Sequence, residues 1–74
     1  MRGKTAFDVE GTVVEKLPPG LLRIELANGH RLLGHVTRRQ ASLVERVRVG
    51  AVVTVNLSPG DLSHGYVILN EENL

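Results

Sequence analysis

Cysteine and tryptophan are absent from the 74 residues of the sequence, and the aromatic side chains are limited to Phe7 and Tyr66. Without cysteine, disulfide bonds and thiolate metal sites are excluded, and a reducing compartment is the natural setting. No segment approaches the roughly 20 apolar residues that a membrane-spanning helix needs. The basic residues at the start precede no apolar stretch, as a signal peptide would require. We therefore expect a cytoplasmic protein without membrane association.

Patterns typical of catalytic and metal sites are also scarce. The glycines lie at turns and one expected bulge, not in a phosphate-binding loop. His30 and His35 are five residues apart on one expected strand and therefore on opposite faces, and His64 lies in an expected turn without neighbouring ligands. Asp61, Ser63 and His64 lie too close in one turn to align for catalysis, and hydrogen bonds within the turn explain them. We expect no enzyme activity, no metal and no cofactor, with His35 hydrogen-bonded at the edge of the core.

The short chain has room for one domain only. A domain of this size buries about 60% of the surface that its unfolded chain exposes, so its core must be economical. We expect a flexible N-terminal segment at residues 1–6, one domain at 7–70 and an acidic tail at 71–74.

Alternating apolar residues predict strands at both ends of the domain. Residues 7–16 and 51–57 alternate between apolar and polar side chains, and residues 64–69 form a last strand. Gly11, inside the first of these strands, favours a bulge or a sharp bend. The predicted inward-facing residues are Phe7, Val9, Gly11 and Val13 in the first strand, and Val53, Val55 and Leu57 in the later one.

The clearest local signal is Asn28–Gly29 between two alternating segments, 21–27 and 30–36. This dipeptide favours a two-residue type I′ turn, in which both turn residues need positive φ. Such a hairpin pairs Ala27 with His30 and so fixes which residues share a face. The predicted core face carries Leu22, Ile24, Leu26, Arg31, Leu33 and His35. The predicted outer face carries Arg23, Glu25, Ala27, His30, Leu32 and Gly34.

A short helix is predicted between the third and fourth strands. Thr37 and Gln40 fit a capping box, and the helix should run from Gln40 to Arg46. Three strands, a helix and two strands are typical of the OB-fold, an all-β, five-stranded Greek-key barrel with one short helix between strands 3 and 4. An SH3-like barrel and an open sheet are the alternatives, and the position of the helix favours the OB-fold.

Positive charge is concentrated in the middle of the chain, although the formal net charge is only +1. Five arginines lie between Arg31 and Arg48, against the single acid Glu45. Arg38 and Arg39 would begin the helix, where the helix dipole disfavours cations, so a bound anion such as phosphate should offset that cost. Binders of unpaired nucleic acid normally use several aromatic platforms, and here Phe7 is expected in the core. The sequence thus predicts that nucleic acid is recognised by shape and charge, not by stacking.

Several segments together resemble one known family. They are Glu10-Gly11-Thr12-Val13, Leu17-Pro18, Arg23-Ile24-Glu25-Leu26, Asn28-Gly29-His30, His35-Val36-Thr37, Val53-Thr54-Val55 and Ser58-Pro59-x-Asp61-Leu62-Ser63-x-Gly65. They resemble bacterial translation initiation factor one, without gaps from about residue 10 to residue 68. The resemblance implies an OB-fold, independently of the strand pattern.

The resemblance also implies binding at the decoding (A-site) region of the small ribosomal subunit. The partners would be 16S rRNA, a neighbouring ribosomal protein and the other initiation factors, and we expect a monomer. By position, Arg23 and Arg46 match arginines typical of the family, Arg39 matches a lysine, and the loop at 17–20 matches one that approaches rRNA. The predicted RNA-binding residues are Lys16, Arg23, Arg31, Arg38, Arg39 and Arg46.

The sequence departs from the family at several basic positions. His64 stands where a lysine or arginine is usual, Tyr66 stands where an arginine is usual, and the chain ends in acidic residues. These departures motivate a second hypothesis, a divergent relative that acts as a protein-interaction module with weakened rRNA binding. A third is a general RNA-binding chaperone, which the scarcity of aromatic residues disfavours.

Overall fold

The structure is a computed structural model that describes residues 6–17 and 19–69. The predicted acidic tail at 71–74, and all but the last residue of the predicted flexible segment at 1–6, lie outside the described residues. No helix among the described residues is long and apolar enough to cross a membrane.

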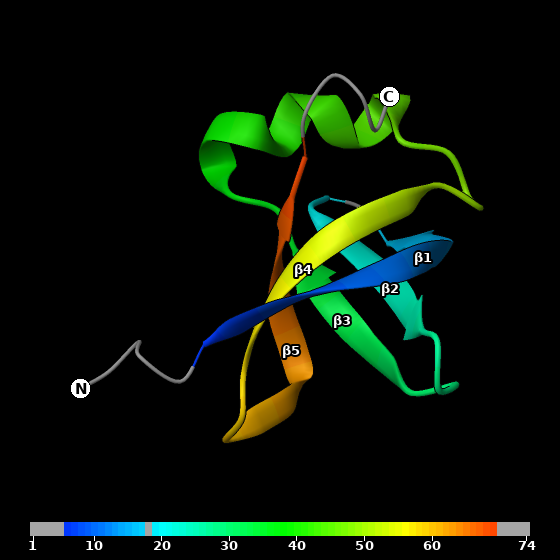
Figure 1. The fold of residues 1–74 in the computed structure, drawn as a ribbon. Coiled ribbons are helices and arrows are strands. Elements are labelled where there is room, and N and C mark those ends of the chain that lie inside the picture. The colour runs from blue at the N-terminus through cyan, green and yellow to red at the C-terminus, as the bar shows by residue number, and fades with distance from the viewer. Residues whose placement is uncertain (1–5, 18, 70–74) are drawn as a thin grey trace.

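Five strands close into a barrel, and one 3₁₀ helix lies across one end of it (Figure 1). The elements are β1 (Phe7–Leu17), β2 (Leu21–Leu26), β3 (Arg31–His35), η1 (Arg38–Arg46), β4 (Val52–Ser58) and β5 (Asp61–Ile68). The barrel order is β1-β2-β3-β5-β4, and β1 also pairs with β4. β3 and β5 are parallel, and the other neighbouring strands are antiparallel. The predicted five-stranded OB-fold with one helix between strands 3 and 4 is confirmed.

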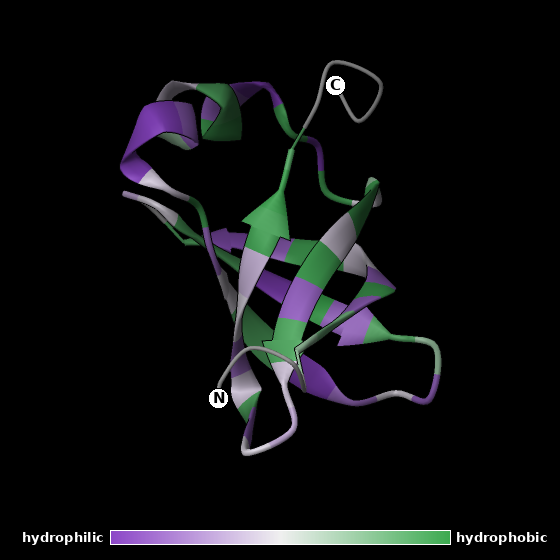
Figure 2. Ribbon diagram, turned by 60° about the vertical axis from the view of Figure 1, so that its left-hand side comes forward, coloured by the Kyte–Doolittle hydropathy of each residue, from purple (hydrophilic) through white to green (hydrophobic). Residues whose placement is uncertain are grey.

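Apolar and polar residues alternate along the strands (Figure 2), and the buried apolar side chains fill the barrel. No polar or charged residue is buried among the described residues. The buried apolar residues are Val13, Leu22, Ile24, Leu32, Val44, Val47, Val53, Val55, Leu57, Val67 and Leu69. Each contributes about 1.5–3 kcal/mol relative to an exposed position, so this small barrel is held together mainly by valine and leucine packing.

The strand starting at Phe7 follows the predicted alternation only in part. Gly11 and Val13 are buried, but Phe7 is 41% exposed, so its predicted place in the core is wrong. The irregularity in β1 lies between Val13 and Glu15, not at Gly11 as the sequence predicted. Gly11 is needed because a Cβ there would collide with the side chain of Ile24.

The β2–β3 hairpin pairs one residue out of the predicted register. Glu25 pairs with Arg31, and Ile24 pairs with Leu32. The turn uses three residues, because Leu26 pairs its backbone with His30, and only Gly29 in it has positive φ, at 88°. Asn28 does not adopt the positive φ that a type I′ turn requires.

Because side chains alternate along a strand, a shift of one residue reverses the two faces of β3. Leu32 and Gly34 are buried inside the barrel, and Arg31 is exposed, while Leu33 and His35 are only partly buried. The predicted faces of β3 were therefore wrong, and His35 lies on the outer surface.

The helix begins at Arg38, so the two arginines start it as predicted, whereas the predicted run from Gln40 to Arg46 was two residues too short. The predicted capping box is absent, because the side chain of Thr37 makes no cap hydrogen bond. Gln40 instead donates its side-chain Nε2 to the Leu69 carbonyl at 2.8 Å, and this bond ties the helix to the end of β5. Val44 is the residue that the helix buries against the barrel.

Candidate nucleic-acid interface

Four of the six predicted RNA-binding residues lie around η1, at one end of the barrel. Arg38 and Arg39 form its start and Arg46 its last turn, and all three are exposed. The first turn contains no acidic residue that would neutralise the two arginines. Lys16, at the end of β1, donates from Nζ to the Glu45 carbonyl at 3.2 Å, so it lies beside the end of the helix. We call Lys16, Arg38, Arg39 and Arg46 the helix-end group.

Arg23 and Arg31 belong to the two strands of the β2–β3 hairpin, and each lies near a carboxylate. Arg23 Nε lies 3.1 Å from Glu15 Oε1, and Arg31 Nη2 lies 3.9 Å from Glu25 Oε1. Arg31 begins β3, at the hairpin turn, whereas η1 follows the other end of that strand. The ion pairs distinguish both arginines from those at the start of η1, and Arg31 also lies apart from the helix-end group in position.

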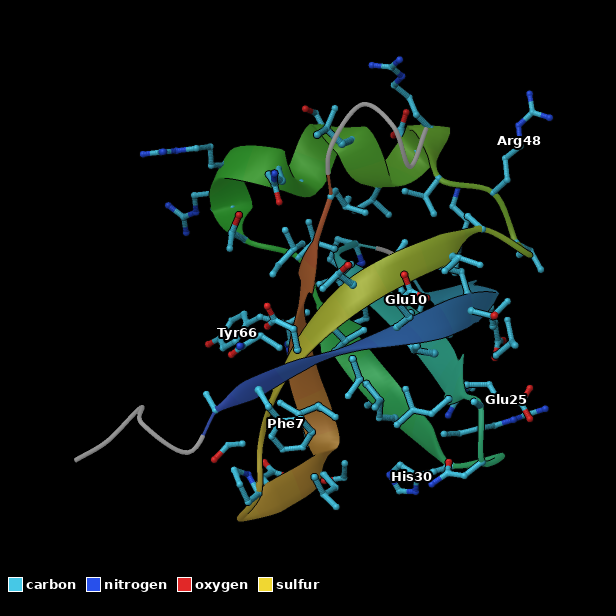
Figure 3. The ribbon with its side chains drawn as sticks, in the orientation of Figure 1. Phe7, Glu10, Glu25, His30, Arg48 and Tyr66 are labelled. Atoms are coloured by element: carbon cyan, nitrogen blue, oxygen red, sulfur yellow. The ribbon has the colours of Figure 1, made fainter. Side chains whose placement is uncertain are left out.

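Acidic side chains gather on another side of the barrel. Glu10 and Glu25 line one shallow pocket between β1 and β2, and Figure 3 shows them on the side away from Tyr66. Among the described residues, no basic side chain lines that pocket. The barrel therefore has a basic end at η1, and Glu10 and Glu25 face a pocket over β1 and β2, with Arg31 beside Glu25.

A pair of histidines joins β3 to β5 on the outer surface. His35 Nε2 lies 2.9 Å from His64 Nδ1, and the two rings stack with centroids 5.1 Å apart. The ring of Tyr66 lies 6.2 Å from that of His35. His64 belongs to β5, so its predicted place in a turn without neighbours was wrong, whereas the predicted hydrogen bond of His35 is confirmed.

Asp61 makes the turn-like hydrogen bonds that its sequence position predicted. Its Oδ1 accepts from Ser63 Oγ at 2.7 Å and from the Ser63 backbone N–H at 3.1 Å. These bonds, the side-chain bond first, lower the pKa of Asp61 below its ordinary value of 3.8. No three side chains of metal-ligating type gather among residues 6–17 and 19–69.

No family model matches the chain. A solved structure does match it, and this comparison decides the family. It is the solution structure of translation initiation factor one from the Wolbachia endosymbiont strain TRS of Brugia malayi. The two sequences are 32% identical over 93% of this chain and 82% of the other, and the TM-score is 0.67. The chain belongs to the family of translation initiation factor one.

Membership of this family confirms the resemblance seen in the sequence and supports a role in translation initiation. The barrel and the position of its helix agree with that family. Sequence reasoning overlooked the ring cluster of His35, His64 and Tyr66, because these residues meet only through the parallel pairing of β3 with β5. No local pattern indicates that pairing; it follows from the OB topology, in which the last strand returns beside the third.

Proposed function

We propose that the chain binds the small ribosomal subunit at the decoding region and assists the other initiation factors there. Its contacts would be with 16S rRNA and a neighbouring ribosomal protein, and it would act as a cytoplasmic monomer. Membership of the initiation factor one family supports this proposal at the level of the process. The observation that supports a particular binding surface is the helix-end group, four cations around one exposed helix.

The distribution of charge indicates which side of the barrel would face the RNA in the proposed complex. Phosphate contacts position a protein on RNA without reading its sequence, and cations without a neighbouring carboxylate are the best placed to make them. Arg38 and Arg39 suit this role, because the first turn of η1 lacks an acid. The surface around Glu10 would face away from the RNA, since like charges repel.

Charge reversal at the start of η1 tests this surface. We expect Arg38→Glu with Arg39→Glu to weaken binding to purified small subunits at least about tenfold, since two phosphate contacts are lost and two repulsive charges are added. Both side chains are exposed, so the thermal unfolding midpoint should change little. Arg31→Glu is the matched control, because it changes the same residue type at the hairpin end, where Glu25 already offsets its charge.

An unchanged affinity in the double variant would remove the start of η1 from the interface. Equal losses in the double variant and in Arg31→Glu, after allowing for the number of charges, would mean that net charge alone drives the binding. Only a larger loss per charge at the helix supports the proposed surface.

The rival function, a protein-interaction module, is favoured by the ion pairs of Arg23 with Glu15 and of Arg31 with Glu25. Capture of partners from a cell extract separates the two. A direct protein partner remains bound after ribonuclease treatment, whereas a complex held by rRNA contacts loses its components.

A further inference from the structure

The pairing between β3 and β5 is the shortest strand pairing among the described residues. It joins three residue pairs, whereas each of the other neighbouring strands is joined by five or six. It is also parallel, and parallel pairs are slightly less stable per residue than antiparallel ones. Figure 1 shows the two strands side by side. A further link between them would therefore stabilise the barrel where its backbone pairing is weakest.

Two imidazole rings meet across this pairing on the outer surface. His64 pairs with Leu33, and His35 follows two residues later on the same face of β3. His35 Nε2 lies 2.9 Å from His64 Nδ1, and the two residues are 29 positions apart in sequence. A link between these nitrogens would close a long loop of the chain, and metal links of that kind constrain the unfolded chain most.

Paired imidazoles are typical ligands of divalent transition metals. Neutral histidine is the commonest metal ligand in proteins, and its nitrogen suits nickel, copper and zinc. In the sequence His64 has no neighbouring ligand, which is why no metal was expected, but the parallel pairing brings His35 to it. Because no third side chain of ligating type joins them among the described residues, water would fill the remaining positions on an ion.

The distance between the two nitrogens favours particular ions. With metal–nitrogen bonds of about 2.0–2.1 Å, nitrogens 2.9 Å apart make an angle of about 90° at the ion. A tetrahedral angle would need the nitrogens to be about 3.3–3.4 Å apart. Right angles belong to square-planar, tetragonal and octahedral coordination, which Cu²⁺ and Ni²⁺ adopt, whereas Zn²⁺ prefers the tetrahedron.

Metal binding would replace the hydrogen bond between the rings. In that bond one ring donates its N–H and the other accepts, whereas both nitrogens must present lone pairs to an ion. The donating ring moves its proton to its other nitrogen through water, so the neutral pair releases no net proton. Both rings then turn until their lone pairs converge, which the exposed surroundings of this bond permit.

Oxygen atoms lie around the pair in the same cleft. Asn56, Ser58 and Asp61 line it together with both imidazoles. Hydrogen bonds from the Ser63 hydroxyl and N–H lower the pKa of Asp61 below 3.8, so its carboxylate is charged at neutral pH and offsets part of the charge of an ion. Such oxygens also accept hydrogen bonds from metal-bound water, and outer contacts of this kind orient and strengthen a metal site.

We propose that His35 and His64 together bind one Ni²⁺ or Cu²⁺ ion, which links β3 to β5. The evidence is a pair of nitrogens at the separation that these ions need, held by strand pairing on an exposed surface. The site goes beyond the proposed function and does not depend on it, because neither imidazole belongs to the helix-end group.

Isothermal titration calorimetry with NiCl₂ on the full chain tests the site. We expect one ion to bind per chain. His35→Gln or His64→Gln should weaken binding at least about tenfold, since even the loss of an outer contact of a metal ligand costs roughly 10–100-fold. Unchanged affinity in either variant would overturn the inference.

His30→Gln is the matched control. It removes the remaining histidine of the chain, whose ring lies 2.8 Å from the Leu62 carbonyl and outside the cleft. This variant should leave the affinity for Ni²⁺ unchanged. An equal loss in all three single variants would mean that Ni²⁺ binds to surface histidines in general, and would contradict the site.

The double variant His35→Gln with His64→Gln shows whether the two rings act together. If one ion needs both nitrogens, each single variant should lose nearly as much affinity as the double variant. Two independent sites would instead lose half of the bound ions in each single variant, at an unchanged Kd. That result would overturn the proposal.

Tyr66 supplies an independent signal, because its ring lies 6.2 Å from that of His35 and the chain has no other tyrosine and no tryptophan. We expect Cu²⁺ to quench its fluorescence saturably in the original chain and in His30→Gln, but not in the double variant. Equal quenching in the double variant would place the ion elsewhere on the chain and contradict the site.

Thermal unfolding tests the link between the strands. Because the ion binds the folded pair, Ni²⁺ should raise the unfolding midpoint increasingly with its concentration, and more than Zn²⁺ does at equal concentration. Mg²⁺, which prefers oxygen ligands, should leave the midpoint unchanged. An equal rise in the double variant, or a larger rise with Zn²⁺ than with Ni²⁺, would overturn the assignment.

Discussion

At the scale of single residues, the polar side chains on the outside of the barrel are held by short local bonds. Asp61 holds Ser63, Asn56 donates from Nδ2 to Asp8 Oδ1 at 2.8 Å, and His30 Nε2 lies 2.8 Å from the Leu62 carbonyl. None of these groups is buried, so each bond contributes modestly to stability. The bonds of Asp61 and His30 hold the start of β5, and the bond of Asn56 joins β4 to β1.

The pKa of Asp61 follows from its bonds to Ser63. Because the folded-state pKa is lowered, the stabilisation is present above the ordinary value of 3.8 and is lost as the pH falls through the lower folded value. We expect Ser63→Ala, which removes the first and largest cause, to raise the pKa of Asp61 toward 3.8. Carbon-detected NMR titration of the carboxylates measures it, and an unchanged pKa would mean that the hydroxyl does not bond to Asp61 in solution.

At the scale of elements, the sequence predicted where strands lie better than how they pair. Val53, Val55 and Leu57 alternate inward as predicted, because period-two burial is a property of one strand. The β2–β3 register depended on the turn, and a three-residue loop with positive φ at Gly29 alone shifted it by one residue. The role of Gln40 was also predicted wrongly. Its hydrogen-bond partner, the Leu69 carbonyl, is 29 residues away in sequence, so no local pattern could indicate it.

Closure of the barrel between β3 and β5 depends on a residue without a side chain. A Cβ at Gly34 would collide with Val67 and lie 3.2 Å from Ile24, both in the interior. We expect Gly34→Ala to lower the free energy of unfolding by about 1–3 kcal/mol, measured by urea denaturation. Gly60→Ala is the control, since nothing lies within 4 Å of a Cβ there. Equal stability of the two variants would contradict the close packing of β3 on β5.

At the scale of the whole molecule, a formal net charge of +1 conceals a division of the surface. The helix-end group marks one end, Glu10 and Glu25 lie over β1 and β2, and the rings of His35, His64 and Tyr66 lie on the outside of β3 and β5. Sequence reasoning identified the arginines, because charge is a property of residue type. Their separation into the helix-end group and an ion-paired set required the folded chain, because Glu15 and Glu25 meet their partners across paired strands.

The central claim, binding to the small ribosomal subunit through phosphate contacts, is tested most directly by the affinity of the labelled chain for purified subunits across a salt series. If the four residues of the helix-end group each contact a phosphate, affinity should fall about a hundredfold between roughly 50 and 200 mM salt, taking the slope for duplex nucleic acid as a guide. We predict saturable binding with that dependence, displaced by a ligand of the A site. Absence of binding at the lowest salt, or saturable binding that salt leaves unchanged, would contradict the account.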